Sequence, residues 1–162
     1  MEATRERRPH ASDDVEARDG QDNPVPTLAL IAHDQKKDDL QAFCRARSAL
    51  LARFALIATG TTGRLIAEAT GLPVHRYLSG PLGGDAQIAA RVAVGEVAGV
   101  IFLVDPLFAH PHEPDIQSLL RVCNVHNVPV ATNGASADYL LRGLSADLDA
   151  ATHSSCVSAT PT

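Results

Sequence analysis

Short apolar runs alternate along the chain with segments whose apolar residues recur at helical spacing. Each run is short and aliphatic, as expected for a strand that is buried on both faces. Five of them predict strands, over residues 27–33 (TLALIAH), 54–59 (FALIAT), 74–78 (VHRYL), 99–105 (GVIFLVD) and 128–132 (VPVAT). The third pattern is the weakest and the fourth is the strongest.

A helix is predicted after each strand. The first follows Asp34, which stands in an N-cap position, and carries Leu40, Phe43 and Cys44 at helical spacing. The others are expected over 64–70, over 85–94, around the stripe of Ile116, Leu119, Leu120 and Cys123, and over 136–142. Five successive strand–helix units imply right-handed crossovers. The predicted class is therefore α/β, a Rossmann-like open parallel sheet of about five strands with helices on both faces.

The two ends of the chain lack this alternation. Residues 1–26 are polar and mixed in charge, and we expect a disordered leader there. Residues 143–162 are small and polar without lysine or arginine, and we expect a mostly disordered tail. The folded domain is therefore predicted over residues 27–142.

Composition and charge exclude some classes of partner. The chain of 162 residues is 45% hydrophobic but only 4% aromatic, which suits an aliphatic core between a parallel sheet and helices. The net charge is -5, and apart from the RERR run at residues 5–8 there is no basic stripe, so no nucleic-acid partner is expected. The apolar runs are too short to cross a bilayer and the N-terminus lacks a signal sequence, so we expect no membrane partner and a cytoplasmic location.

The three cysteines are odd in number, widely spaced and without a CxxC pair. They are interpreted as reduced thiols, with Cys44 and Cys123 packed on helix faces.

Polar and reactive side chains follow every predicted strand. Ligands of open α/β sheets bind at the carboxyl ends of the strands, so these side chains are expected to gather at one edge. They are His33 and Asp34 after the first strand, Thr59, Gly60, Thr61, Thr62 and Gly63 after the second, Ser79, Gly80 and Asp85 after the third, Asp105, His112 and Asp115 after the fourth, and Thr132 and Asn133 after the fifth.

The segment TGTTG, residues 59–63, lies between a strand and a helix. Backbone N–H groups and the helix dipole favour an anion there, and threonine hydroxyls add donors, so a phosphate cradle is predicted. An ordinary turn capped by Thr61 or Thr62 is the alternative. Lys37 either projects a cation toward the same edge or is a solvated surface lysine.

The segment SGPLGGD, residues 79–85, surrounds one carboxylate with three glycines and a proline. Its permissive backbone lets a ligand approach Asp85 closely, although a surface turn could use the same residues. Three other carboxylates have structural alternatives to a catalytic role: Asp34 as a helix cap, Asp105 as an acceptor that fixes a loop, and Asp115 as an acid in the first turn of its helix.

The histidines and aspartates of this edge also suit a metal ion, but they lack HExxH or comparable spacing. No metal is expected.

Five motifs in this order and spacing resemble those of the methylglyoxal synthases: IAHDQKK, ATGTTG, LSGPLGGD, FLVDPLFAHPHEPD and VPVATN. The resemblance extends from about Leu28 to Leu141. It implies conversion of dihydroxyacetone phosphate to methylglyoxal and inorganic phosphate without a metal or organic cofactor. It also implies a Rossmann-like fold and a homohexamer.

The resemblance implies a role for each matching residue. Asp85 would be the catalytic base, and His33 would polarise the substrate carbonyl and help to move protons. The phosphate-binding residues would be Lys37, Thr59, Gly60, Thr61, Thr62, Ser79 and Gly80, and the rest of the active site would be Asp34, Asp105, His112 and Asp115.

The residue chemistry suits this reaction. Removal of a proton α to a carbonyl requires a base near the carbon and an electrophile at the oxygen, and Asp85 and His33 can fill these positions. The enediolate then expels phosphate most easily when the breaking C–O bond is perpendicular to the enediolate plane, so the cradle would hold the phosphate out of that plane.

The chain departs from the family pattern at its end. Many members continue through a further strand and helix whose arginine reaches a neighbouring subunit's phosphate site, whereas no lysine or arginine follows Arg142 here. We expect catalysis to be retained, but phosphate-linked communication between subunits lacks this arginine.

The alternative function is a regulatory module similar to the effector-binding domain of carbamoyl phosphate synthetase, which needs no base. A third is a phosphate-handling isomerase or phosphatase. The presence of Asp85, His33, His112 and Asp115 together favours the lyase.

Overall fold

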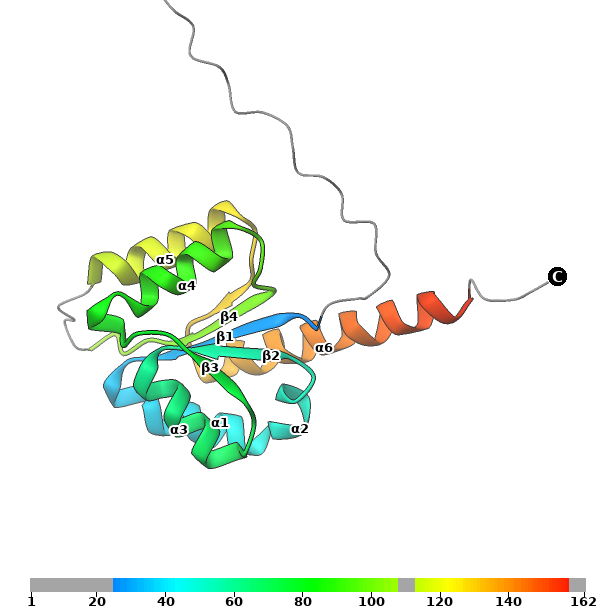
Figure 1. Ribbon diagram of the computed structural model, residues 1–162, viewed down its shortest axis with the longest axis horizontal. Helices are drawn as coiled ribbons and strands as arrows, with labels where there is room; N and C mark the ends of the chain where they lie inside the picture. The colour runs from blue at the N-terminus through cyan, green and yellow to red at the C-terminus, as the bar shows by residue number, and fades with distance from the viewer. Residues whose placement is uncertain (1–24, 108–112, 158–162) are drawn as a thin grey trace, which may run out of the picture.

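Five parallel strands form one sheet in residues 25–107 and 113–157, the part of the chain that this computed structural model describes (Figure 1). The order across the sheet is β3-β2-β1-β4-β5. The strands are β1 (Thr27–Ala32), β2 (Ala55–Ala58), β3 (Val74–Arg76), β4 (Gly99–Leu103) and β5 (Val130–Ala131). The predicted open parallel sheet is confirmed. Each strand is shorter than its apolar run, because the run continues where the chain has already left the ladder of hydrogen bonds.

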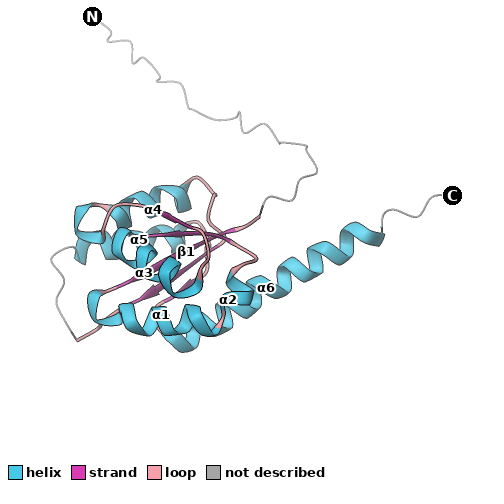
Figure 2. Ribbon diagram, turned by 60° about the horizontal axis from the view of Figure 1, so that its bottom comes forward, coloured by secondary structure: helices cyan, strands magenta, loops and turns pink. Residues whose placement is uncertain are grey.

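Helices cover both faces of the sheet (Figures 1 and 2). Helices α4 and α5 pack on one face, and α1, α2, α3 and α6 pack on the other. Their bounds are α1 (Lys37–Ala46), α2 (Ser48–Leu51), α3 (Gly60–Thr70), α4 (Gly84–Ala93), α5 (Glu113–Val125) and α6 (Gly134–Val157), with short 3-10 helices η1 (Asp34–Lys36) and η2 (Gly80–Leu82).

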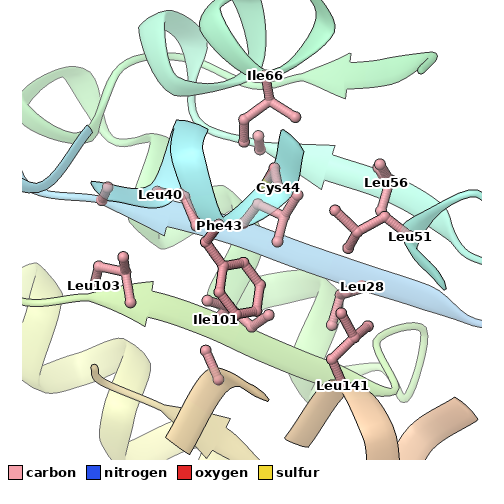
Figure 3. Close-up of a cluster of buried hydrophobic side chains, with 14 of the residues drawn as sticks. Leu28, Leu40, Phe43, Cys44, Leu51, Leu56, Ile66, Ile101, Leu103 and Leu141 are labelled. Carbon is pink, nitrogen blue, oxygen red and sulfur yellow. The ribbon is translucent and has the colours of Figure 1, made fainter. Parts of the chain in front are cut away.

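The central strand β1 supplies side chains to both cores in alternation. Leu28 and Leu30 belong to the core under α1, α3 and α6, which Figure 3 shows together with Ile101 of β4. Ala29 and Ile31 belong to the core under α4 and α5. Because successive residues of a strand point to opposite faces, the next odd-numbered position, residue 33, faces the α4 side of the sheet.

The two cysteines predicted to pack on helix faces do so. Cys44 and Cys123 are buried free thiols. Burial raises the pKa of the Cys44 thiol to about 12 and also raises the pKa of Cys123. Both are therefore protonated and unreactive at neutral pH.

The prediction of a disordered tail from residue 143 is wrong for most of its length, because α6 continues to Val157. Leu144 and Leu148 pack against the core, and Arg53 donates to Asp149 across 2.6 Å. These contacts join α6 to residues distant in sequence, so local composition does not reveal them. Residues 158–162 and the predicted leader up to residue 24 lie outside the described residues.

Two predicted helix starts are also corrected. Asp34 is not an N-cap: it opens η1, whose N-cap is His33, and α1 begins three residues later. Helix α3 begins at Gly60, so TGTTG forms its first turn rather than a preceding loop. Its N-cap is Thr59, without a side-chain capping hydrogen bond, so neither Thr61 nor Thr62 caps this helix.

Candidate active site

A cavity of about 250 Å³ opens where the strand order reverses. The chain runs from β1 to β2 and β3 on one side, then returns to β4 on the other, and ligands of such sheets bind at this reversal beside the carboxyl ends of the strands. The cavity is lined by Ile31, Ala32, His33, Asp34, Lys37, Thr59, Thr61, Thr62, Ser79, Gly80, Pro81, Asp85 and Phe102. Most of the site residues predicted from the sequence therefore meet in one place.

His33 lies at the end of β1 and is only 4% exposed. Its backbone N–H donates to the Leu103 carbonyl across 3.1 Å, which continues the pairing with β4. Its Nδ1 accepts the backbone N–H of Asp105 across 2.8 Å. A nitrogen that accepts a hydrogen bond carries no proton, so the neutral ring has its proton on Nε2 and is a donor from that atom.

The ring of His33 is also held by Phe102. The two ring centroids are 5.0 Å apart in a T-shaped arrangement, and Phe102 is fully buried. Ile31 and Phe102 are partners in the β1–β4 register, and together they form the apolar floor of the cavity. This floor keeps water from one side of the imidazole.

Asp85 lies in the first turn of α4 and is 1% exposed. Its position depends on the two glycines before it. Gly83 has a left-handed φ of 96°, and a Cβ on Gly84 would lie 2.0 Å from the Leu78 carbonyl oxygen. Glycine at both positions therefore lets α4 begin against the end of β3, which places the carboxylate in the cavity.

The opposite wall of the cavity is the first turn of α3. The N–H of Gly60 donates to the Leu78 carbonyl, whereas Thr61 and Thr62 line the cavity. The N–H groups of a first helical turn have no acceptor within the helix and attract anions. With Ser79 on the neighbouring loop, this wall has the donors that a phosphate group requires.

Lys37 supplies a cation at the cavity. It pairs with Asp34, whose side chain is 87% exposed, while that of Lys37 is 21% exposed. Asp34 therefore holds Lys37 at the mouth of the cavity from the solvent side. The reading of Lys37 as a solvated surface lysine is not supported.

Several predicted residues do not line this cavity. The Asp105 carboxylate accepts the Leu107 N–H across 3.0 Å, so it fixes its own loop as the structural alternative predicts. Asp115 is half-buried in the first turn of α5. Gly60 lines an adjoining hollow, and Thr132 and Asn133 line a separate apolar cavity of about 600 Å³. His112 lies outside the described residues.

The residues that sequence reasoning missed are the apolar ones, namely Ile31, Ala32, Pro81 and Phe102. Strand alternation could have found Ile31 and Phe102, because they share the face of His33.

Within the described residues, no three His, Cys, Asp or Glu side chains are grouped so as to hold a metal ion. In the same residues, no helix combines the length and apolarity of a membrane span.

Comparison with known proteins agrees with this geometry. The family model described as the MGS-like domain matches residues 39–132. Methylglyoxal synthases from Carboxydothermus hydrogenoformans and Thermus thermophilus are each 65% identical over 117 residues, which is 72% of this chain and 97% and 93% of theirs. The crystal structure of methylglyoxal synthase from Elizabethkingia anophelis superposes with a TM-score of 0.68 at 46% identity, over 72% of this chain and 76% of that one. The fold, the cavity that His33 and Asp85 share and these relatives together lead to one conclusion: the chain belongs to the methylglyoxal synthase family.

Proposed function

We propose that this chain is a lyase that converts dihydroxyacetone phosphate to methylglyoxal and inorganic phosphate. The observation that carries the proposal is a single cavity. It is lined by the buried side chains of Asp85 and His33 and by residues that can donate hydrogen bonds to a phosphate group, namely Lys37, Thr61, Thr62 and Ser79. A substrate whose carbonyl and phosphate are a few bonds apart can contact both sets of residues at once. The relatives' name is that of the same enzyme.

Asp85 is proposed as the base that removes the proton next to the carbonyl. Its burial keeps water away from the carboxylate, which favours its accepting a proton from carbon. Its place on the first turn of a helix, fixed by Gly84 against Leu78, gives it a defined position for that transfer.

His33 is proposed as the electrophile at the carbonyl oxygen. With its Nδ1 engaged by Asp105 N–H, the ring presents Nε2–H as a donor. As the proton leaves carbon, negative charge develops on that oxygen, and a donor already in position stabilises it without reorganisation. The phosphate then departs, and Lys37, the threonines and Ser79 stabilise its charge.

Elimination also sets a geometric requirement. The cradle has to hold the breaking C–O bond perpendicular to the enediolate plane, since only then do the π electrons of the enediolate overlap the bond. An isomerase would hold the same bond in the plane and retain the phosphate.

The remaining residues of the family pattern, Asp34, Asp105, His112 and Asp115, are proposed to complete the site. Asp105 acts there through its backbone N–H on His33, and Asp34 acts through Lys37. We further propose a homo-oligomer, a hexamer by resemblance to the family, and a cytoplasmic location. Light scattering of the purified chain measures the assembly.

The deciding experiment is to incubate the purified protein with dihydroxyacetone phosphate in EDTA and to assay methylglyoxal and phosphate separately. Equal amounts of both are expected. Phosphate with dihydroxyacetone would mean a phosphatase, and glyceraldehyde 3-phosphate would mean an isomerase. Phosphate binding without any product would mean a regulatory module.

A further inference from the structure

A second hollow of about 440 Å³ adjoins the phosphate-binding wall of the active site. We name it the arginine annex, and it is lined by Gly60, Thr61, Arg64, Arg76, Tyr77 and Ser79. Thr61 and Ser79 also line the active-site cavity, so the two hollows meet at the residues proposed to bind phosphate. The annex is therefore continuous with the site, and its lining adds two arginines, Arg64 and Arg76.

The two arginines come from different elements and are each held in place. Arg64 lies one helical turn after Thr61 on α3 and pairs with Glu68 across 2.9 Å and 3.2 Å. Arg76 is the last residue of the edge strand β3, in register with Ala58. A Cβ on Gly63 would lie 2.7 Å from Cγ of Arg76, so the glycine makes room for the arginine stem to cross the start of α3.

The annex is lined by cationic side chains although the chain as a whole is acidic. The net charge of the chain is -5, yet no acidic residue lines the annex. Glu68 offsets part of the charge of Arg64, whereas no carboxylate among the described residues pairs with Arg76. A guanidinium presents several N–H groups in a fixed fork that suits phosphate oxygens.

We propose that the arginine annex is a second phosphate site, which binds the phosphoryl dianion before it enters the cradle and after it leaves. Its ligands are inorganic phosphate and the phosphoryl group of a small phosphate ester. Because annex and cradle share Thr61 and Ser79, two dianions bound there would be neighbours and would repel each other, so the two sites hold the anion in turn. This inference rests on the proposed function, since it takes the neighbouring cradle to be the phosphate site of catalysis.

The test is calorimetric titration of the full chain with inorganic phosphate at low ionic strength. Lys37→Gln removes a cation from the cradle and so weakens phosphate binding there. Because Lys37 lines the active-site cavity and not the annex, the phosphate binding that remains reports on the annex. In that background, Arg64→Gln with Arg76→Gln is expected to raise the dissociation constant at least about tenfold, as loss of charge-assisted contacts does. Arg45→Gln with Arg121→Gln, at two exposed arginines of α1 and α5 that line neither hollow, is the matched charge control.

Arg76→Lys separates direct contact from a general field effect. A lysine keeps the charge but not the fork, so direct contact predicts a dissociation constant between that of the parent and that of the Arg76→Gln variant. Binding by the Arg76→Lys variant equal to that of the parent would overturn the proposal. So would a change in the variant with Arg64→Gln and Arg76→Gln no larger than that of Arg45→Gln with Arg121→Gln.

Titration with sn-glycerol 3-phosphate, which has no carbonyl to react, distinguishes the two ligand sources. If the variant with Arg64→Gln and Arg76→Gln binds both ligands more weakly, the annex binds substrate and product. If it binds only inorganic phosphate more weakly, the annex binds the product alone. Either result supports the site. The titration does not depend on turnover. If the protein makes methylglyoxal but the arginine variants bind phosphate as the parent does, only this inference is contradicted. If the arginine variants lose phosphate binding but the protein makes no methylglyoxal, only the proposed function is contradicted.

Discussion

The backbone N–H of Asp105 donates to Nδ1 of His33 across 2.8 Å, so the loop after β4 decides which nitrogen of this histidine carries the proton when the ring is neutral. The expected tautomer is the one protonated at Nε2. Nitrogen-15 NMR of histidine-labelled protein measures this directly, through a bare-nitrogen shift at Nδ1 and a protonated one at Nε2. The opposite assignment would remove His33 as a donor from Nε2.

Asp85→Asn tests the base. The amide keeps the size of the side chain but accepts no proton from carbon, so kcat is expected to fall at least about a hundredfold, the low end of general-base effects. The melting temperature should stay close to that of the parent. Asp147→Asn, an exposed aspartate of α6, serves as control. Full activity of Asp85→Asn would transfer the base to Asp115 or Asp34.

Gly84→Ala tests the contact that positions Asp85. The added Cβ would lie 2.0 Å from the Leu78 carbonyl oxygen, so α4 has to shift. We expect a loss of about 3 kcal/mol in unfolding free energy, typical of overpacking, together with a loss of activity. Gly143→Ala in α6 meets nothing within 4 Å and is expected to stabilise the chain by about 0.5–1 kcal/mol. Denaturant titration of both variants checks this, and an unperturbed Gly84→Ala would contradict the proposed packing.

Asp138 gives stability that depends on pH. The side chains of Arg47 and Arg142 both donate to it, and the hydrogen bond from Arg47 is the main reason that its pKa is held below 3.8. A lowered pKa means that this contribution is present above pH 3.8 and is lost as the pH falls through the lower folded value. The melting temperatures of parent and Asp138→Asn should therefore differ at pH 7 and converge as the pH falls below 3.8. A constant difference across this range would contradict the ionic origin.

The part of α6 from Leu144 onward is expected to stabilise the fold. A Cβ on Gly99 of β4 would lie 2.8 Å from Cδ1 of Leu144, which shows how closely α6 packs on the sheet. Removal of residues 144–162 also removes Leu148 and is expected to cost about 2–3 kcal/mol of unfolding free energy, as for two half-buried leucines. A truncated chain as stable as the parent would show that the α6 contacts contribute nothing.

Local pattern was sufficient for the alternation of strands and helices, because a strand buried on both faces needs a continuous apolar run and a covering helix needs an apolar stripe. It was not sufficient for the ends of elements. The second half of α6 has a weak apolar signal and depends on partners such as Arg53, far away in the sequence.

The sequence by itself determined the fold class, the edge of the sheet where the chemistry lies and the motifs around His33 and Asp85, since each is a short-range property of the chain. Only the tertiary structure decided which polar groups share a cavity. It separated Thr132 from the cavity that His33 and Asp85 share, placed the backbone N–H of Asp105 against His33, and joined Arg64 and Arg76 in one annex. The reason is that these relationships depend on strand order and on close contacts such as that of Gly84 with Leu78, which no local pattern encodes.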